Sequence, residues 1–169
     1  AIATVADGVT ALQIKGGEDW RRDLELVRRL RRALPAGTKL RLDANQGYRQ
    51  PKVAINVIRA LEDVGLDYVE QPVMGLADMA EVKRSVSTPV VADESCWDGA
   101  DVLDIVHARA ADCISIYLAK AGGLTGARTV AAIAEIAGLP SDVNGSIESG
   151  IGNAANVHFA LAMPAVTMA

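Results

Sequence analysis

Six polar side chains recur along the chain at intervals of 23 to 28 residues, each at the end of a short run rich in Val, Ile and Leu. They are Lys15, Asp43, Glu70, Asp93, Tyr117 and Asn144. Carboxylates are hard oxygen ligands that suit Mg²⁺, lysine can act as a general base, and a tyrosine hydroxyl can donate a proton or hydrogen bond. Brought together, these groups would support acid–base chemistry assisted by a divalent metal ion.

Three of the six are acids, namely Asp43, Glu70 and Asp93. Carboxylates a few ångströms apart raise one another's pKa, and a divalent cation removes that cost. The alternative is that they are ordinary strand-end acids paired with Lys or Arg. Two interpretations are also open for Lys15. It is either a base whose pKa a nearby cation depresses, or the partner of an adjacent carboxylate such as Glu94.

The apolar runs and the stretches between them define the elements that must position these groups. We expect strands at residues 11–15, 40–43, 68–70, 90–93, 113–117 and 141–144. Helical periodicity predicts helices at 19–34, 53–65, 76–86, 101–110, 124–138 and 149–163. A strand, a helix and two loops every 25 to 30 residues is typical of a (β/α) barrel, where the C-terminal strand ends meet at one face. The rival, a doubly wound sheet, is disfavoured because no GxGxxG or GxxxxGK[ST] motif occurs.

Composition excludes several classes of protein. The chain has 169 residues, 50% apolar and 22% charged, with net charge −4, and it has no apolar run long enough for a membrane span. We therefore expect one domain over 1–169 with neither nucleic-acid nor membrane partners. Two cysteines without metal-type spacing favour a reduced, cytoplasmic protein.

The motifs QIKGG, LDANQGY, YVEQP, VADES, SIYLAKAGG and NGSIESGIG, in this order, resemble the C-terminal barrel of the enolase superfamily, in particular its muconate lactonizing enzyme subgroup. The resemblance implies an α/β fold, a partial TIM-type barrel of about strands 2–7 without the N-terminal capping domain. It implies Mg²⁺, or else Mn²⁺, bound by Asp43, Glu70 and Asp93. It also implies Lys15 as the base that removes a proton α to a carboxylate, with a metal-stabilised enediolate as the intermediate.

Two positions depart from the subgroup's pattern. Gln13 stands where the family has the first lysine of its KxK motif, and Tyr117 stands where the subgroup has its opposite-face lysine. Lys120 matches a further lysine of that pattern, so either Tyr117 or Lys120 is the second acid/base. The departure argues against two-base racemisation and favours one-base cycloisomerisation or β-elimination of water.

Several further residues could line the site. Asn45 and Gln71 follow predicted ligands and are either hydrogen-bond donors behind them or loop caps. Asn144, Ser146 and Glu148 lie at the end of the strand where family members contact substrate, although they could instead cap the next helix.

The leading expectation is an isomerase or cycloisomerase acting on a small-molecule carboxylate. The alternatives are an acid-sugar or hydroxy-acid dehydratase, and a non-catalytic barrel fragment that needs a missing domain or partner. A complete barrel runs to about 250 residues, so the chain corresponds to about two-thirds of one. Exposed sheet edges would favour a homo-oligomer.

Overall fold

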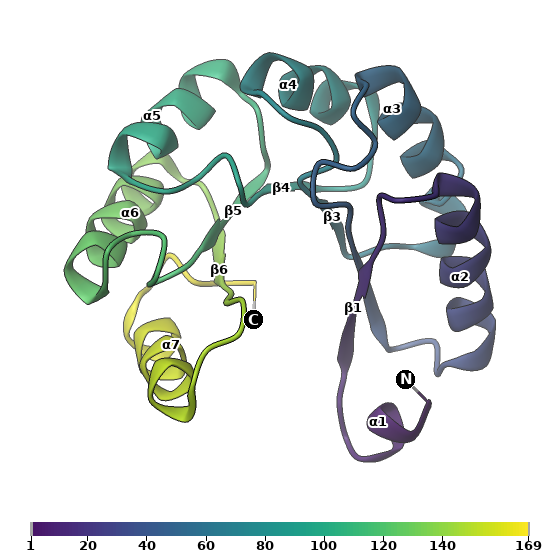
Figure 1. Ribbon diagram of the computed structural model, residues 1–169, viewed down its shortest axis with the longest axis horizontal. Coiled ribbons are helices and arrows are strands. Elements are labelled where there is room, and N and C mark those ends of the chain that lie inside the picture. The colour runs from purple at the N-terminus through teal and green to yellow at the C-terminus, as the bar shows by residue number, and fades with distance from the viewer. Residues whose placement is uncertain (1, 169) are drawn as a thin grey trace. The chain divides into compact units, whose positions relative to one another are not determined.

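The computed structural model describes residues 2–168, which divide into two compact units between Val90 and Val91. The first unit contains strands β1 (Ala11–Lys15), β2 (Lys39–Asp43) and β3 (Tyr68–Glu70). Its helices are α1 (Ile2–Ala6), α2 (Trp20–Ala33), α3 (Pro51–Arg59) and α4 (Leu76–Ser85), with a short 3₁₀ helix at Glu62–Val64. Strands and helices alternate along the chain, as Figure 1 shows.

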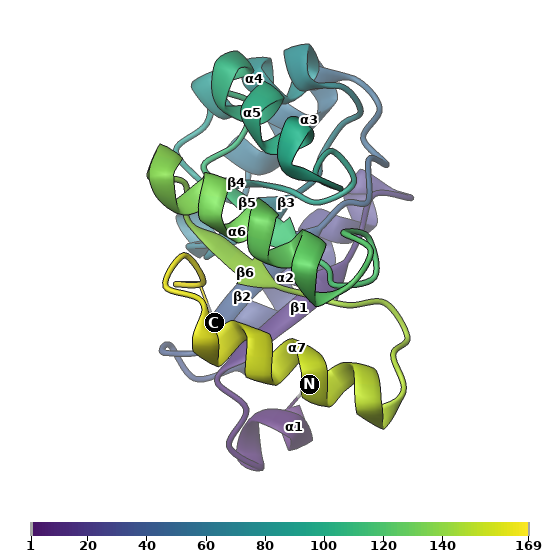
Figure 2. The same ribbon diagram turned by 90° about the vertical axis from the view of Figure 1, so that its left-hand side faces the viewer.

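The second unit continues the same alternation. Strand β4 (Val90–Ala92) spans the boundary, and β5 (Cys113–Ile116) and β6 (Ser141–Val143) follow. The helices are α5 (Gly99–Ala108), α6 (Leu124–Ala137) and α7 (Gly150–Ala162). Helix α6 packs on β5 and α7 contacts β6 (Figure 2).

Local sequence signals set the helix ends. The Asp19 side chain caps α2 by accepting a hydrogen bond from the backbone N–H of Arg21, and Pro51 occupies the first turn of α3. Asp98 and Asp101 form a reciprocal capping box at the start of α5. Gly138 ends α6 in the left-handed conformation that glycine adopts without cost. These signals explain why the predicted helices agree with those observed.

The strand register places the polar groups. Strand neighbours follow chain order, β1-β2-β3-β4-β5-β6, and the described pairs are parallel. Lys15 pairs with Asp43, and Asp43 with Glu70, so these three residues form one row across β1, β2 and β3. Alternate residues point to opposite faces of a strand, so Leu40 and Leu42, both fully buried, lie on the face opposite that row. The fold is thus α/β with the parallel, in-order strands of a partial (β/α) barrel, as predicted.

Small differences from the predicted elements concern boundaries. Asp93, Tyr117 and Asn144 lie one residue beyond β4, β5 and β6. The predicted helix at 53–65 is interrupted after Arg59 and resumes as the 3₁₀ turn, and α1 was not expected. No helix within residues 2–168 combines the length and the apolar character that a membrane crossing requires.

Candidate active site

Lys15 forms the centre of a polar cluster in the first unit. Its ammonium group donates a hydrogen bond to Asp43 Oδ2 in an ion pair. Gln13, two residues earlier on the same face of β1, donates from Nε2 to Glu70 Oε2 at 2.7 Å and to Asp43 Oδ2 at 3.4 Å. Asp43 and Glu70 are fully buried, so the lysine charge and the amide compensate two carboxylates removed from water.

Gln13 was noted in the sequence only as a departure, and its role as a bridge between two acids was missed. The two-residue period of a strand could have revealed this role, because it places the Gln13 and Lys15 side chains on the same face of β1. An uncharged amide there satisfies Glu70 without adding the second positive charge that a lysine would bring.

The loop after β2 is tightly wound around Asp43. The backbone N–H of Asn45 donates to Asp43 Oδ1 at 2.9 Å, and that of Gln46 donates to the carbonyl of Gln71 at 2.7 Å. Asn45, Gln46 and Gln71 all have positive φ, a conformation that costs energy for residues other than glycine. Gln71 also donates from Nε2 to the Val73 carbonyl at 2.9 Å. The Gln71 side chain therefore braces the loop after β3, in which Gln71 itself lies.

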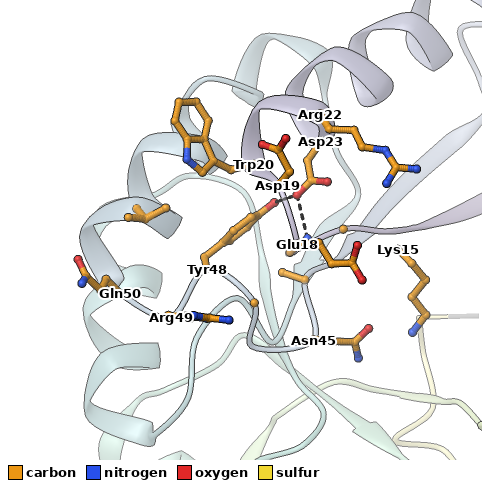
Figure 3. Close-up of a pocket in the computed structure, with 15 residues that line it drawn as sticks. Lys15, Glu18, Asp19, Trp20, Arg22, Asp23, Asn45, Tyr48, Arg49 and Gln50 are labelled. Atoms are coloured by element: carbon orange, nitrogen blue, oxygen red, sulfur yellow. Dashed lines mark hydrogen bonds between the residues drawn. The ribbon is translucent and has the colours of Figure 1, made fainter.

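A cavity of about 850 Å³ opens beside Lys15 in this unit. Figure 3 shows Lys15 and Asn45 at one side of it and Trp20 and Gln50 at the other. Charged side chains of both signs line it, namely Lys15, Glu18, Asp19, Arg22, Asp23 and Arg49. The cavity could therefore take a polar ligand next to the Lys15 amine.

The second unit contains a separate cluster around Asp93. Lys120 forms an ion pair with Asp93 Oδ1, and the Tyr117 hydroxyl donates to Oδ2 at 3.2 Å. The Lys120 ammonium also lies 4.2 Å from the centre of the Tyr117 ring. The two predicted candidates for the second acid/base thus both contact the same carboxylate.

Cys96 lies near this cluster and is buried. Burial raises the pKa of its thiol to about 12, although the nearby Lys120 charge opposes the shift. Its backbone N–H donates to the Asp93 carbonyl at 2.9 Å, so its place in the fold is that of a small buried residue in the β4–α5 loop.

The remaining predicted residues make local contacts. Asn144 accepts a hydrogen bond at Oδ1 from the N–H of Gly145, and Glu148 accepts one from Ser146. The cap of α7 is Ser149 rather than any of these three. Glu94 is partly buried and accepts a hydrogen bond at its backbone carbonyl from the Trp97 indole N–H. Their part in substrate contact stays a prediction.

The metal ligands also stay a prediction. Within residues 2–168 no group of three or more His, Cys, Asp or Glu side chains forms a ready metal site. Asp43 and Glu70 nevertheless fit a hard divalent cation. They are adjacent in the ladder and buried, and the ligand atoms that they offer are carboxylate oxygens.

Comparison with known proteins gives a consistent picture. A family model described as "Enolase C-terminal domain-like" matches residues 1–169. The L-Ala-D/L-Glu epimerase of Bacillus subtilis is 40% identical over 165 residues, which are 95% of this chain and 45% of that protein. The chain spans about half the length of the curated relatives it matches.

Solved structures agree in fold. The dipeptide epimerase from Cytophaga hutchinsonii, complexed with Mg and the dipeptide D-Ala-L-Val, superposes with a TM-score of 0.93 at 30% identity, covering 98% of this chain and 45% of that one. A muconate cycloisomerase from Pseudomonas fluorescens gives a TM-score of 0.90 at 30% identity, covering 96% and 47%.

Proposed function

Because the chain belongs to the enolase C-terminal domain-like family, we propose that the protein containing it removes a proton α to the carboxylate of a small-molecule substrate. The observation that carries the proposal is the row of Lys15, Asp43 and Glu70 across three strand ends, beside an open cavity. Strand ends of this kind are where such folds build their active sites.

Lys15 is the proposed base. Its Nζ takes the proton from the substrate α-carbon, and the electron pair of the broken C–H bond moves into the carboxylate to form an enediolate. Return of a proton to the opposite face of that carbon completes an epimerisation, whereas return to the Lys15 face regenerates the substrate. Gln13 keeps Glu70 in place while Lys15 moves away from Asp43 toward the substrate.

Asp43 and Glu70 are proposed to hold Mg²⁺, and the sequence motifs add Asp93 as a third ligand. When bound, the cation supplies positive charge that stabilises the substrate carboxylate as negative charge develops on it. Support comes from the burial and the all-oxygen chemistry of the acids, and from the relative whose structure was solved with Mg. Mn²⁺ is a weaker proposal, because that relative was solved with Mg.

The proposed substrate is a dipeptide. Relatives at 40% and 38% identity are named an L-Ala-D/L-Glu epimerase and a hydrophobic dipeptide epimerase, whereas two muconate cycloisomerases are matched at 30% and 35%. These names favour a dipeptide over the cycloisomerase substrate expected from the motifs alone. The dehydratase alternative has no comparable support.

A second candidate concerns stereochemistry. Epimerisation needs an acid/base on each face of the α-carbon, and here Tyr117 replaces the lysine that the subgroup carries. Tyr117 and Lys120 are both engaged with Asp93. This observation favours one-base chemistry, in which Lys15 alone exchanges the α-proton on one face without inversion. The net reaction is then cycloisomerisation or β-elimination of water rather than epimerisation.

The test is proton exchange in D₂O with Mg²⁺, followed by NMR on L-Ala-L-Glu and L-Ala-D-Glu separately. One-base chemistry exchanges the α-proton of a single epimer, whereas epimerisation exchanges both and interconverts them. Lys15→Ala should abolish exchange, and Lys52→Ala, at an exposed lysine, should leave it unchanged. Exchange that persists in Lys15→Ala would remove Lys15 as the base.

The ligand set is tested separately by calorimetric Mg²⁺ titration. Asp43→Asn, Glu70→Gln and Asp93→Asn should each weaken binding, because each replaces a charged ligand by a neutral one. Unchanged affinity in all three variants would exclude the assignment. If the full-length protein neither binds Mg²⁺ nor exchanges any α-proton, the non-catalytic alternative applies.

A cytoplasmic location is proposed because both cysteines, Cys96 and Cys113, are buried thiols rather than disulfide-bonded cystines. The homo-oligomer stays a prediction.

A further inference from the structure

We propose that Asp23 and Tyr48 form a positioning pair that holds the loop after β1, and through it the Lys15 amine, in the place that proton removal requires. The inference rests on the proposed role of Lys15 and adds two residues that the family motifs do not assign. Both residues lie at the wall of the cavity beside Lys15 and are proposed to act through Lys15 rather than on the reacting atoms, so both are positioning residues.

One buried oxygen atom joins three segments of the first unit. Asp23, on α2, accepts at Oδ2 a hydrogen bond of 2.8 Å from the backbone N–H of Gly17 and one of 3.0 Å from the Tyr48 hydroxyl. Gly17 belongs to the loop after β1 and Tyr48 to the loop after β2. Asp23 and Tyr48 are each only 4% exposed, and hydrogen bonds to a charged group in such surroundings are among the stronger ones (Figure 3).

The two loops touch backbone to backbone at glycines. A Cβ atom on Gly47 would overlap the Gly17 carbonyl, and one on Gly17, which has φ +94°, would overlap the carbonyl oxygen of Ala44. Gly16 has Asp23 Oδ2 2.8 Å from the position of its missing Cβ. The two loops therefore pack so closely that no side chain fits at these glycines. The Asp23 carboxylate links the two loops through its hydrogen bonds to Gly17 and Tyr48.

Lys15 needs such support because its own side chain is 65% exposed. Surface packing does little to hold a long flexible side chain, so its position depends on the backbone at Lys15 and on its contact with Asp43. That backbone is anchored by the Gly16 N–H, which donates to the Asp43 carbonyl at 2.8 Å, and by the next residue's bond to Asp23.

The Tyr48 hydroxyl is kept as a donor. Burial, with the adjacent Asp23 charge, raises the pKa of Tyr48 far above its ordinary value of 10.0. The hydroxyl stays protonated throughout the physiological range, so the bond to Asp23 does not vary with pH there.

The first test does not depend on catalysis. Trace acetylation of the full-length protein, read by mass spectrometry, compares labelling of Lys15 with that of Lys52 as an internal standard. Asp23→Ala and Tyr48→Phe should raise Lys15 labelling at least about threefold, because the ion pair with Asp43 loosens. Asp23→Asn, whose amide oxygen can accept both hydrogen bonds, should label like the parent protein.

The matched control is Asp67→Ala. Asp67 also forms a partly buried ion pair in the first unit, with Arg41 at 3.0 Å, but it precedes β3 rather than following a strand. If Lys15 labelling rises as much in this control, or stays unchanged in both Asp23→Ala and Tyr48→Phe, the positioning role is wrong. If Asp23→Ala fails to fold, labelling of Tyr48→Phe alone tests the positioning role, since that substitution removes only one oxygen atom.

The second test uses exchange of the α-proton of L-Ala-L-Glu or L-Ala-D-Glu. Asp23→Ala should lower kcat about tenfold or more with KM nearly unchanged, because a base misplaced by about 1 Å loses rate rather than affinity. In Lys15→Ala protein rescued with methylamine, adding Asp23→Ala should have little further effect. An equal loss in both backgrounds would mean a general structural role.

The two tests separate the possible failures. Changed Lys15 labelling in a protein that exchanges no α-proton would refute the proposed function and leave the positioning pair in place. Lys15-dependent exchange that is indifferent to Asp23→Ala and Tyr48→Phe would refute the positioning pair alone.

Discussion

The Lys120 ammonium donates a hydrogen bond of 2.8 Å to the backbone carbonyl oxygen of Asp93 and a second one to the side chain of the same residue. A third bond, of 3.3 Å, reaches the Ser115 carbonyl. An ammonium group has three protons, and here each has an acceptor. Lys120 thus fixes Asp93 to the end of β5, a structural role that its position in the motif did not reveal.

We predict that Lys120→Met lowers the free energy of unfolding by about 3 kcal/mol, because it leaves a buried carboxylate without its cation. The Lys120 side chain is only 11% exposed, so solvent would compensate little of the loss. Urea denaturation of the full-length protein measures the effect. Lys52→Met is the control at an exposed position, and a similar small loss in both variants would contradict the prediction.

Alkaline pH should destabilise the protein through Tyr48. Its pKa is raised in the folded chain by burial and by Asp23. The protonated hydroxyl therefore contributes stability that is fully present below the unfolded pKa, near 10, and is lost as pH rises above it. The free energy of unfolding should fall by about 1.4 kcal/mol per pH unit more steeply in the parent protein than in Tyr48→Phe. Urea denaturation from about pH 9 to 11 provides the comparison, and equal slopes would disprove the assignment.

Both cysteines should resist alkylation in the native protein. Cys96 and Cys113 are buried, and burial raises the pKa of the Cys96 thiol to about 12, so little thiolate exists at pH 8. With iodoacetamide we expect labelling at least about a hundredfold slower than in the urea-unfolded chain. Rapid labelling of Cys96 under native conditions would show that the loop after β4 opens.

Gly47→Ala should be destabilising where Gly37→Ala is not. A Cβ at Gly47 would overlap the Gly17 backbone, whereas one at Gly37 meets nothing within 4 Å. The clash is with backbone and cannot be relieved by a rotamer change, so a loss of about 1–3 kcal/mol is expected on thermal or urea unfolding. Equal stability of the two variants would show that the two loops can separate without cost.

Much of the fold could be predicted from local patterns. Apolar runs at 11–15 and 113–117, and amphipathic stretches such as 124–138, correspond to β1, β5 and α6. Caps such as Asp19 and Gly138 are recognised from residue type and from the residues next to them, so the start of α2 and the end of α6 could be predicted. The short helix α1 and the break after Arg59 were not predicted, because weak local preferences there are decided by packing.

Which residue types lie at the strand ends could be predicted without coordinates, since strand period and repeat length are local properties of the chain. The sequence could not determine which of them pair. Gln13 meets Glu70 across 57 positions, and Tyr48 meets Asp23 across 25. Lys120 was one of two candidates for the second acid/base, and its contacts with Asp93 could not be read from the motif. Such pairings depend on strand register and loop packing between distant segments, and only the tertiary structure brings those segments together.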